Sequence, residues 1–470
     1  MELIDRSAVA LVGLLRAGKI SPHDCLKALE ARIAVVEPRV NALPTLCFER
    51  AHAAADAMMA RPLAERGLLA GLPVAIKDLS DVAGVRTTYG SPIFADHVPA
   101  ASDLTVSVIE GQGGVVYAKS NTPEFGAGAN TFNAVFGATR NPWNLSRSAA
   151  GSSGGAAAAL ASGTAWLAHG SDLAGSCRSP ASFCGVVGLR PSPGRVPQSR
   201  KTSLDSTLGV QGPLARTVAD CALFLDAMVG EDPRDPISKP PPRGSFLAAV
   251  EAGGRPRRVA YSPDLGITPV DPQIAAITRA AALRLEAAGV IVEEAHPDFS
   301  AAHETFQTLR ALAFAVNFSG LLRTRRDELK PEVVWNIERG LALTPPQIVQ
   351  AEHARAAMAA GAAAFFETYD LLLCPAAITA AFPVEERYLR ECAGRTFDTY
   401  VDWLAIVYAP TLICAPALSL PCGFTQAGLP VGLQIIGPSG ADARVLVGAK
   451  LLEDMLALDT GRVVEPREGL

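Results

Sequence analysis

A lysine and two serine-containing turns are the residues whose chemistry stands out in this sequence. Lys77 ends the apolar stretch GLPVAIK, Ser152 and Ser153 lie between glycines in AAGSSGGAAAA, and Ser176 closes the turn DLAGS. Folding that removes a lysine from water lowers its pKa, so that its neutral amine could act as a base near neutral pH. Serines at two separate turns supply candidate nucleophiles. The set indicates nucleophilic catalysis that needs no histidine.

The serine pair also has a simpler interpretation. Glycine and serine are the ordinary composition of a flexible connection. This run, however, leads into the strongly helix-forming stretch AAAALA, which places both serines at a helix N-terminus. Unpaired backbone N–H groups at such a terminus favour negative charge. We therefore predict the start of a helix here, in preference to a linker.

Residues Gly151 to Gly155 also match the G-x-S-x-G pattern of a nucleophile elbow, with Ser153 as the nucleophile. An elbow directly follows a strand, whereas we predict that the preceding NPWNLSRSAA forms an irregular loop. An elbow also needs an acid and then a histidine downstream. No motif surrounds the three histidines available in order, His296, His303 and His353. The elbow stays an alternative interpretation.

The turn that ends in Ser176 follows the apolar segment TAWLA, for which we predict a strand. Its small residues offer consecutive backbone N–H groups, which could form an oxyanion hole for a tetrahedral intermediate. A simple glycine turn is the other interpretation. In the same way, Lys77 at a strand end could merely face solvent. Neither feature decides the function alone.

Short apolar segments that alternate with helical ones must position these residues. Strands are predicted at 73–76, 114–119, 164–168 and 185–189. Helices begin at Asp103 and after Gly155, and the alternation returns from residue 258 with a long helix from Asp271 to Gly289. The segment GFTQAGLP predicts a hairpin turn between the last two strands. The pattern predicts an α/β fold, with a sheet covered by helices on both faces.

We expect two parts in the chain. Residues 1–60 are predicted to be helical, with N-caps at Ser7 and Ser21, and to pack on the core. Residues 61–470 would form the α/β domain, with a variable and mostly helical excursion at about 300–370. The Pro-rich stretch DPISKPPPRGS at 235–245 is the one candidate linker or insertion loop.

Composition excludes several classes of function. Hydrophobic residues make up 49% of the 470 positions and the net charge is −5, with basic residues scattered, so we expect a globular protein that does not bind nucleic acid. The longest apolar stretch, 371–384, is broken by prolines and shorter than the ~20 residues of a membrane span. We read no secretion signal and expect a cytoplasmic location. Nine cysteines without a CxxC pair indicate reduced thiols, and no ligand spacing indicates a metal.

Three parts of the chain resemble the amidase signature family. They are GLPVAIKD, then GSSGGAAAALASG followed by GSDLAGSCRSPASFCGVVGLRPSPGRVP, and finally LSLPCGF with GLPVGLQIIGP near the C-terminus. The resemblance extends to the segment from NTPEFG to NPWN and leaves only about 300–400 variable. It implies a large mixed β-sheet covered by helices on both faces, and hydrolysis of a carboxylic amide without a cofactor.

The resemblance further implies a Ser–cisSer–Lys triad. Ser176 aligns with the nucleophile, Ser152 with the bridging serine whose peptide bond is cis, and Lys77 with the base. Neutral Lys77 would draw a proton through Ser152 from Ser176, which attacks the amide carbonyl. The proton would then pass to the leaving amine, and water would hydrolyse the acyl-enzyme.

Residues around the triad also align with family positions. Those that match the oxyanion hole are Leu173, Ala174, Gly175 and Ser176. Those that match supporting hydrogen bonds are Ser153, Asp172 and Arg178, and those that match the substrate pocket are Gly126, Ala127 and Gly151. Two places depart from the family pattern. Ala174 stands where glycine is common, and Ala149-Ala150-Gly151 stands where Pro-Gly-Gly is usual, so we expect activity with an altered pocket shape.

The function expected from the resemblance is hydrolysis of a small amide, and an anilide, carbamate or ester could share the chemistry. Aromatic residues of the variable segment could favour an aryl or alkyl acyl group: Trp335, Phe366, Tyr400, Trp403 and Tyr408. The first alternative is the glutamine-hydrolysing subunit of a tRNA-dependent amidotransferase complex. The second is the elbow hydrolase built on Ser153, and the third is a scaffold of this fold without activity. A homodimer is one option for the assembly.

Overall fold

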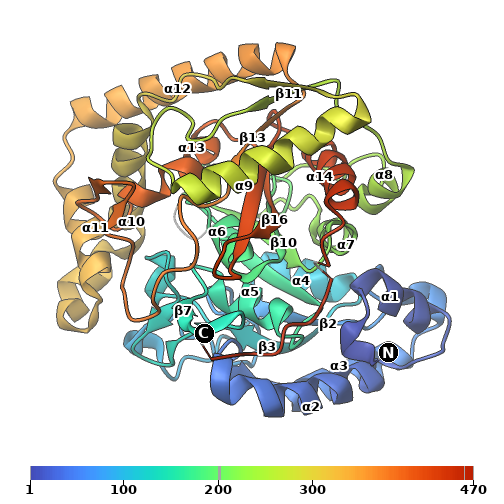
Figure 1. The fold of residues 1–470 in the computed structure, drawn as a ribbon. Coiled ribbons are helices and arrows are strands. Elements are labelled where there is room, and N and C mark those ends of the chain that lie inside the picture. Colours follow the sequence, from blue (N-terminus) through green and yellow to red (C-terminus); the bar gives the residue numbers. More distant parts are fainter. Residues whose placement is uncertain (1, 200–202, 460, 469–470) are drawn as a thin grey trace.

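A large mixed sheet forms the centre of the molecule (Figure 1). The computed structural model describes residues 2–199, 203–459 and 461–468. Within them, eleven strands pair in the order β1-β3-β2-β8-β10-β9-β16-β17-β13-β11-β12. They are β1 (Thr45–Leu46), β2 (Pro73–Lys77), β3 (Val115–Ser120), β8 (Leu167–Asp172), β9 (Val187–Arg190), β10 (Val210–Ala215), β11 (Arg258–Tyr261), β12 (Ile291–Glu294), β13 (Leu371–Pro375), β16 (Ala417–Phe424) and β17 (Pro430–Ile436).

Six short strands form three hairpins outside this sheet. They are β4 (Phe132–Asn133) with β5 (Gly137–Ala138), β6 (Arg140–Asn141) with β7 (Asn144–Ser148), and β14 (Glu391–Cys392) with β15 (Arg395–Thr396). The β6–β7 hairpin corrects the prediction of an irregular loop in NPWNLSRSAA. The Asn141 side chain organises it, since its Oδ1 accepts a hydrogen bond from the Trp143 N–H at 3.0 Å and its Nδ2 donates to the Ser148 carbonyl at 3.1 Å. Side-chain turn chemistry therefore produced strand pairing that hydrophobic periodicity does not reveal.

Helices cover both faces of the sheet, as predicted. They are α1 (Ala8–Arg16), α2 (Pro22–Val40), α3 (Phe48–Met59), α4 (Leu104–Gly111), α5 (Gly154–Ala161), α6 (Arg178–Cys184), α7 (Val218–Met228), α8 (Phe246–Ala252), α9 (Pro272–Leu283), α10 (Ala302–Arg325), α11 (Pro331–Leu341), α12 (Pro345–Thr368), α13 (Ala405–Leu412) and α14 (Asp442–Leu456). Helices α5 and α6 pack against each other and on the strands that carry the serine turns, and α7 packs with α14 elsewhere on the sheet.

Helix and strand ends follow the sequence signals in most places. Ser7 and Ser21 cap α1 and α2, and Ser21 forms a capping box with Asp24. Two ends differ from prediction. Strand β8 lies three residues later than expected and runs on to Asp172, because β10 pairs with it residue for residue up to that point. The helix predicted to reach Gly289 tightens into a 3₁₀ turn after α9, before Gly289 adopts a φ of +73°.

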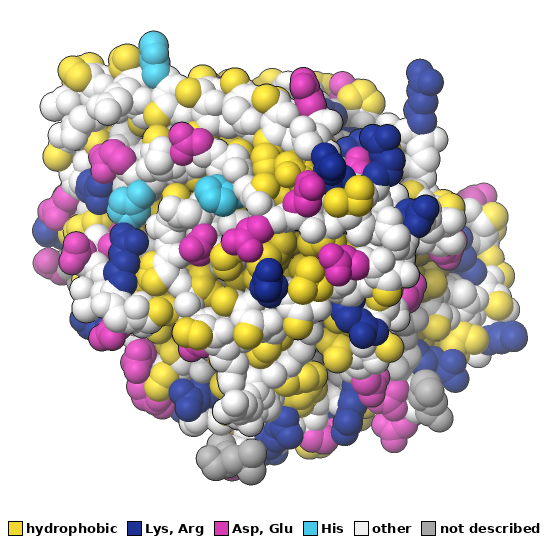
Figure 2. All heavy atoms as spheres, turned by 45° about the horizontal axis from the view of Figure 1, so that its top comes forward, with side chains coloured by type: hydrophobic (Ala, Val, Ile, Leu, Met, Phe, Trp, Pro, Cys, Tyr) yellow, Lys and Arg dark blue, Asp and Glu magenta, His cyan; other side chains and the backbone are white. Residues whose placement is uncertain are grey.

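The helical excursion predicted at about 300–370 consists of α10, α11 and α12, which lie at the left and top of Figure 1. Figure 2 shows the molecule with that top turned forward, and acidic and basic side chains alternate there with apolar ones. No helix within the described residues is both long and apolar enough to cross a membrane. The nine cysteines, all of them in the described part, are free thiols and mostly buried.

Candidate active site

Lys77 lies in the interior although it ends a strand. Strand β2 is a central strand, parallel to both β3 and β8, and each of its five residues is buried. Parallel strands of this kind are covered on both faces, which explains the continuous apolar run before the lysine. The side chain of Lys77 is therefore carried out of water by the sheet. The simple interpretation, a strand end that faces solvent, is wrong.

Three hydroxyl groups surround the Lys77 amine. Its Nζ lies 2.7 Å from Ser152 Oγ, 2.8 Å from Ser153 Oγ and 3.0 Å from Ser171 Oγ. Ser171 comes from the end of β8, next to β2 in the sheet. Sequence reasoning missed it, since only the strand register brings it to the lysine. The amine is thus bound by neutral oxygens from two separate turns.

Burial lowers the pKa of Lys77 to about 7, because the charged form loses its hydration, and the Asp172 carboxylate nearby opposes this only in part. A neighbouring lysine shows the contrast. Lys119 on β3 is equally buried but lies 3.2 Å from the carboxylate of Asp78 and donates to the Ser80 carbonyl at 2.8 Å. Lys119 is an ion-paired structural lysine, whereas Lys77 can be a neutral base.

The serine turn approaches Lys77 through a tightly packed stretch of backbone. The Gly151–Ser152 peptide bond is cis, and Ala150 before it has a φ of +55°. A Cβ on Gly151 would lie 3.2 Å from the backbone of Ala129, so little more than glycine fits there. Helix α5 starts directly after Ser153, as the alanine run predicts. The turn therefore holds Ser152 Oγ toward the lysine.

Ser153 connects the two serine turns instead of facing the cavity. Its N–H donates to the Ser176 carbonyl at 3.1 Å, and its hydroxyl lies between Lys77 and the Ser171 carbonyl, which it meets at 3.3 Å. The side chain is completely buried. The three histidines that an elbow would use do not line the cavity described below. This placement removes the geometric basis for the elbow alternative.

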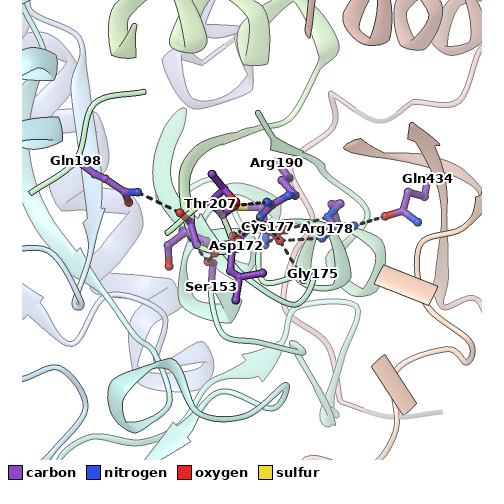
Figure 3. Close-up of polar contacts among 12 residues, drawn as sticks. Ser153, Asp172, Gly175, Cys177, Arg178, Arg190, Gln198, Thr207 and Gln434 are labelled. Carbon is purple, nitrogen blue, oxygen red and sulfur yellow. Dashed lines mark hydrogen bonds and ion pairs between the residues drawn. The ribbon is translucent and has the colours of Figure 1, made fainter. Parts of the chain in front are cut away.

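The turn that carries Ser176 is built around the carboxylate of Asp172 (Figure 3). Asp172 accepts hydrogen bonds from the N–H of Gly175 at 3.0 Å and of Cys177 at 3.1 Å, and from Arg178 Nε at 3.0 Å. Burial alone would raise the pKa of Asp172, but Arg178 and Arg190 hold it at about 2. Arg178 also bonds Gln434 on β17, as the figure shows. The carboxylate thus stays charged and fixes the turn.

Gly175 and Ala174 answer different conformational demands in this turn. Gly175 has a φ of +91°, and a Cβ there would lie 2.4 Å from Val407 Cγ2. Ala174 is not among the residues with positive φ, so alanine is accommodated without strain where the family has glycine. The departure that concerns the backbone is Ala150, which adopts the left-handed conformation that glycine favours.

A cavity of about 240 Å³ opens over the two serine turns. Its polar floor includes Ser152, Ser171 and Ser176. The remaining lining residues used below are Leu79, Phe125, Gly126, Ala129, Leu173, Ala174, Arg310, Phe314, Tyr400 and Leu404. Among the described residues, Ser176 Oγ has no hydrogen-bond partner. The arrangement can therefore offer a free hydroxyl, a proton-accepting amine and backbone N–H groups to one bound molecule.

Comparison with known proteins identifies this arrangement. The model of the family described as Amidase matches residues 24–446. The chain belongs to the amidase family. This amidase is 35% identical to an acylamidase from Rhodococcus erythropolis over 94% of its own chain and 93% of the relative. It is 36% identical to the A-type subunit of a glutamyl-tRNA(Gln) amidotransferase from Moorella thermoacetica, over 96% and 97% of the two chains.

A solved structure agrees with both the fold and the class of enzyme. A bacterial aryl acylamidase of the amidase signature enzymes superimposes with a TM-score of 0.91 at 26% identity, covering 99% of each chain. The expected fold, a large mixed sheet with helices on both faces, is confirmed. The expected reaction class is confirmed too, since this amidase is an enzyme that hydrolyses the C–N bond of amides.

The structure also locates the remaining residues named from the sequence. Gly126 lines the cavity, and a Cβ on it would lie 3.5 Å from Ser152 Oγ, so the glycine leaves room beside that hydroxyl. Ala127 and Gly151 are near but do not line it. Of the five aromatic residues considered for the pocket, only Tyr400 reaches the lining. Arg310 on α10 lines the cavity and was missed, because no motif marks it.

Proposed function

We propose that this amidase cleaves small amides through an acyl-enzyme on Ser176, with Ser152 as the proton bridge and Lys77 as the base. The supporting observation is the buried Lys77 amine, 2.7 Å from a hydroxyl on the floor of the cavity that Ser176 also lines. A pKa of about 7 leaves much of this amine neutral at neutral pH. A neutral amine has the lone pair that proton abstraction requires.

The proposed reaction starts with proton transfer from Ser176 Oγ to Ser152 Oγ, while Ser152 passes its own proton to Lys77 Nζ. Ser176 Oγ forms a bond to the amide carbonyl carbon, and the carbonyl oxygen takes up the negative charge. As the C–N bond breaks, the proton returns along the same path to the leaving amine. A water molecule, deprotonated in the same way, then releases the carboxylate and restores Ser176.

Backbone N–H groups of the 172–176 turn would stabilise the oxyanion. The Gly175 N–H already donates to Asp172, so in our proposal Gly175 contributes the shape of the turn. The N–H groups of Leu173, Ala174 and Ser176 have no other acceptor within the described part of the chain, and these residues line the cavity. They are the donors that we assign to the oxyanion hole.

Removal of single side chains tests this assignment. We expect Ser176→Ala and Lys77→Ala each to lower kcat on 4-nitroacetanilide by at least 10³-fold, and Ser152→Ala by roughly 10²- to 10⁴-fold, the range for a lost proton-transfer group. Lys27→Ala, an exposed position on α2, is the matched control. Unchanged hydrolysis in the Ser176 or Lys77 variant would refute the mechanism. A fluorophosphonate probe should label Ser176, and label on Ser153 would restore the elbow.

An amidotransferase component is the second candidate, because the relative from Moorella thermoacetica is as similar to this chain as the acylamidase is. The aryl acylamidase structure, which superimposes over 99% of both chains, favours a free-standing hydrolase of acyl or aryl-acyl amides. A comparison of L-glutamine with anilides, carbamates and esters decides between them. Glutaminase activity together with co-purified partner proteins would favour the amidotransferase.

A further inference from the structure

Arg310 is a buried cation on the wall of the catalytic cavity. It comes from α10, only 4% of its surface is exposed, and it lines the same cavity as Ser152 and Ser176. Among the residues that the structure describes, no carboxylate lies within 4 Å of its guanidinium. This distinguishes Arg310 from Arg178, which lies 2.8 Å from Asp172. A buried charge without a counter-ion costs free energy unless something else compensates it.

The groups that hold Arg310 in place are all neutral. Its guanidinium donates to Asn336 Oδ1 and to the hydroxyl of Tyr400. It also lies over two aromatic rings, 4.5 Å from the ring centre of Phe314 and 5.1 Å from that of Tyr400. These contacts fix the orientation of the side chain and leave its charge in place. Three of the five guanidinium N–H groups remain for another acceptor.

The nearest acidic residues are committed elsewhere. Glu332 on α11 lies 2.6 Å from Arg387 and 4.0 Å from Lys330. Glu124 accepts hydrogen bonds from the Ser91 hydroxyl at 2.6 Å and the Lys330 N–H at 2.8 Å. Three cations therefore face two carboxylates in this part of the molecule. The excess positive charge is the one that points into the cavity, at Arg310.

We propose that Arg310 binds a carboxylate of the substrate, so that this amidase prefers amides with an acidic group away from the scissile bond. The proposal rests on the proposed function of Ser176 as the nucleophile. A guanidinium matches a carboxylate with two parallel hydrogen bonds, which gives both charge and direction. Leu79, Phe125, Ala129 and Leu404 line the cavity too, which suits an apolar spacer between the two ends of the substrate.

Two matched pairs of substrates test the proposal. Glutaric acid mono-4-nitroanilide and pentanoic acid 4-nitroanilide differ by a carboxylate on the acyl side, and 4-acetamidobenzoate and 4-acetamidotoluene by one on the amine side. We expect the wild-type enzyme to favour the acidic member of at least one pair by tenfold or more in kcat/KM. In Arg310→Met this ratio should fall at least tenfold, mainly through KM of the acidic substrate, and Arg310→Lys should retain part of it.

Arg323→Met is the matched control, because Arg323 lies exposed on the same helix, and it should keep the wild-type ratio. Two results would overturn the proposal: a wild-type enzyme that favours the neutral member of both pairs, or an Arg310→Met enzyme with an unchanged ratio. The wild-type ratio decides even if Arg310→Met does not fold. Failure of the proposed Ser176 chemistry is a separate result, since Ser176→Ala would then still hydrolyse both members of a pair.

Discussion

The activity of this amidase should fall as the pH decreases through about 7, because the proposed base is the neutral form of Lys77. Burial lowers its pKa from 10.5 to about 7. At pH 7 about half of the molecules then carry a neutral amine, compared with roughly one in 3,000 for a solvated lysine. At pH 6 the neutral fraction is about one tenth, so kcat/KM should be about tenfold below its plateau.

The assay is kcat/KM on an anilide that does not titrate, measured from pH 5.5 to 9. Two buried carboxyl groups away from the cavity, Glu37 and Glu453, also have pKa values raised by burial to about 7 and could imitate the effect. Glu37→Gln and Glu453→Gln should therefore leave the midpoint of the profile where it is. A flat profile, or a midpoint above pH 9, would refute the assignment of Lys77 as a neutral buried base.

The same pKa difference makes a prediction for stability. The unfolded chain protonates Lys77 below about pH 10.5, but the folded protein does so only below about pH 7. Between these values, folding therefore loses about 1.4 kcal/mol per pH unit as the pH falls. Lys77→Met removes this dependence. Urea unfolding at pH 9 and pH 7 should show the variant gaining roughly 2.5 kcal/mol relative to the wild-type protein, and a constant difference would contradict the argument.

Three further substitutions test the turns around the site. Gly175→Ala should lower the free energy of unfolding by more than about 2 kcal/mol and reduce kcat, because its Cβ would overlap a buried valine, whereas Gly428→Ala, also at positive φ but in open space, should cost only about 1 kcal/mol; equal costs in urea unfolding would count against the packing argument. Asp172→Asn should destabilise the protein by roughly 3–5 kcal/mol, since it leaves buried guanidinium groups unpaired, and should move the midpoint of the pH–rate profile below that of the wild type, because the carboxylate raises the pKa of the lysine; an upward move would contradict this electrostatic role. Ala150→Gly should be neutral or stabilising by up to about 1 kcal/mol, because relief at φ +55° exceeds the lost methyl burial, whereas Ala174→Gly should destabilise by about 0.5–1 kcal/mol; thermal unfolding with the opposite order would disprove the assigned conformations.

Much of the fold and part of the site could be predicted from the sequence. The apolar run before Lys77 and the alanine run after Ser153 are strong local signals, and they correctly gave a strand end and a helix start. The hairpin between the last two strands was equally clear, because GFTQAGLP separates two alternating apolar segments. These features depend on residues close together in the chain, where local physical chemistry dominates.

Other features could not be predicted because they depend on distant parts of the chain. Ser171 reaches Lys77 only through the pairing of β2 with β8, and its own neighbours give no sign of this contact. Arg310 lies on a long helix with many charged residues, and nothing local distinguishes it from the exposed Arg323. The difference between them is burial at a cavity, which is a property of the assembled fold.

The position of β16 and β17 in the sheet has a consequence for how the protein is made. These strands come from near the C-terminal end of the sequence, yet they lie at the middle of the sheet, between β9 and β13 (Figure 1). Arg190 at the end of β9 and Ala417 at the start of β16 are separated by roughly 10 to 45 s of synthesis at ordinary ribosomal rates. During that interval β9 and β13 each have an open edge that can pair with another chain. We expect the nascent chain to need protection from aggregation until its last strands have left the ribosome.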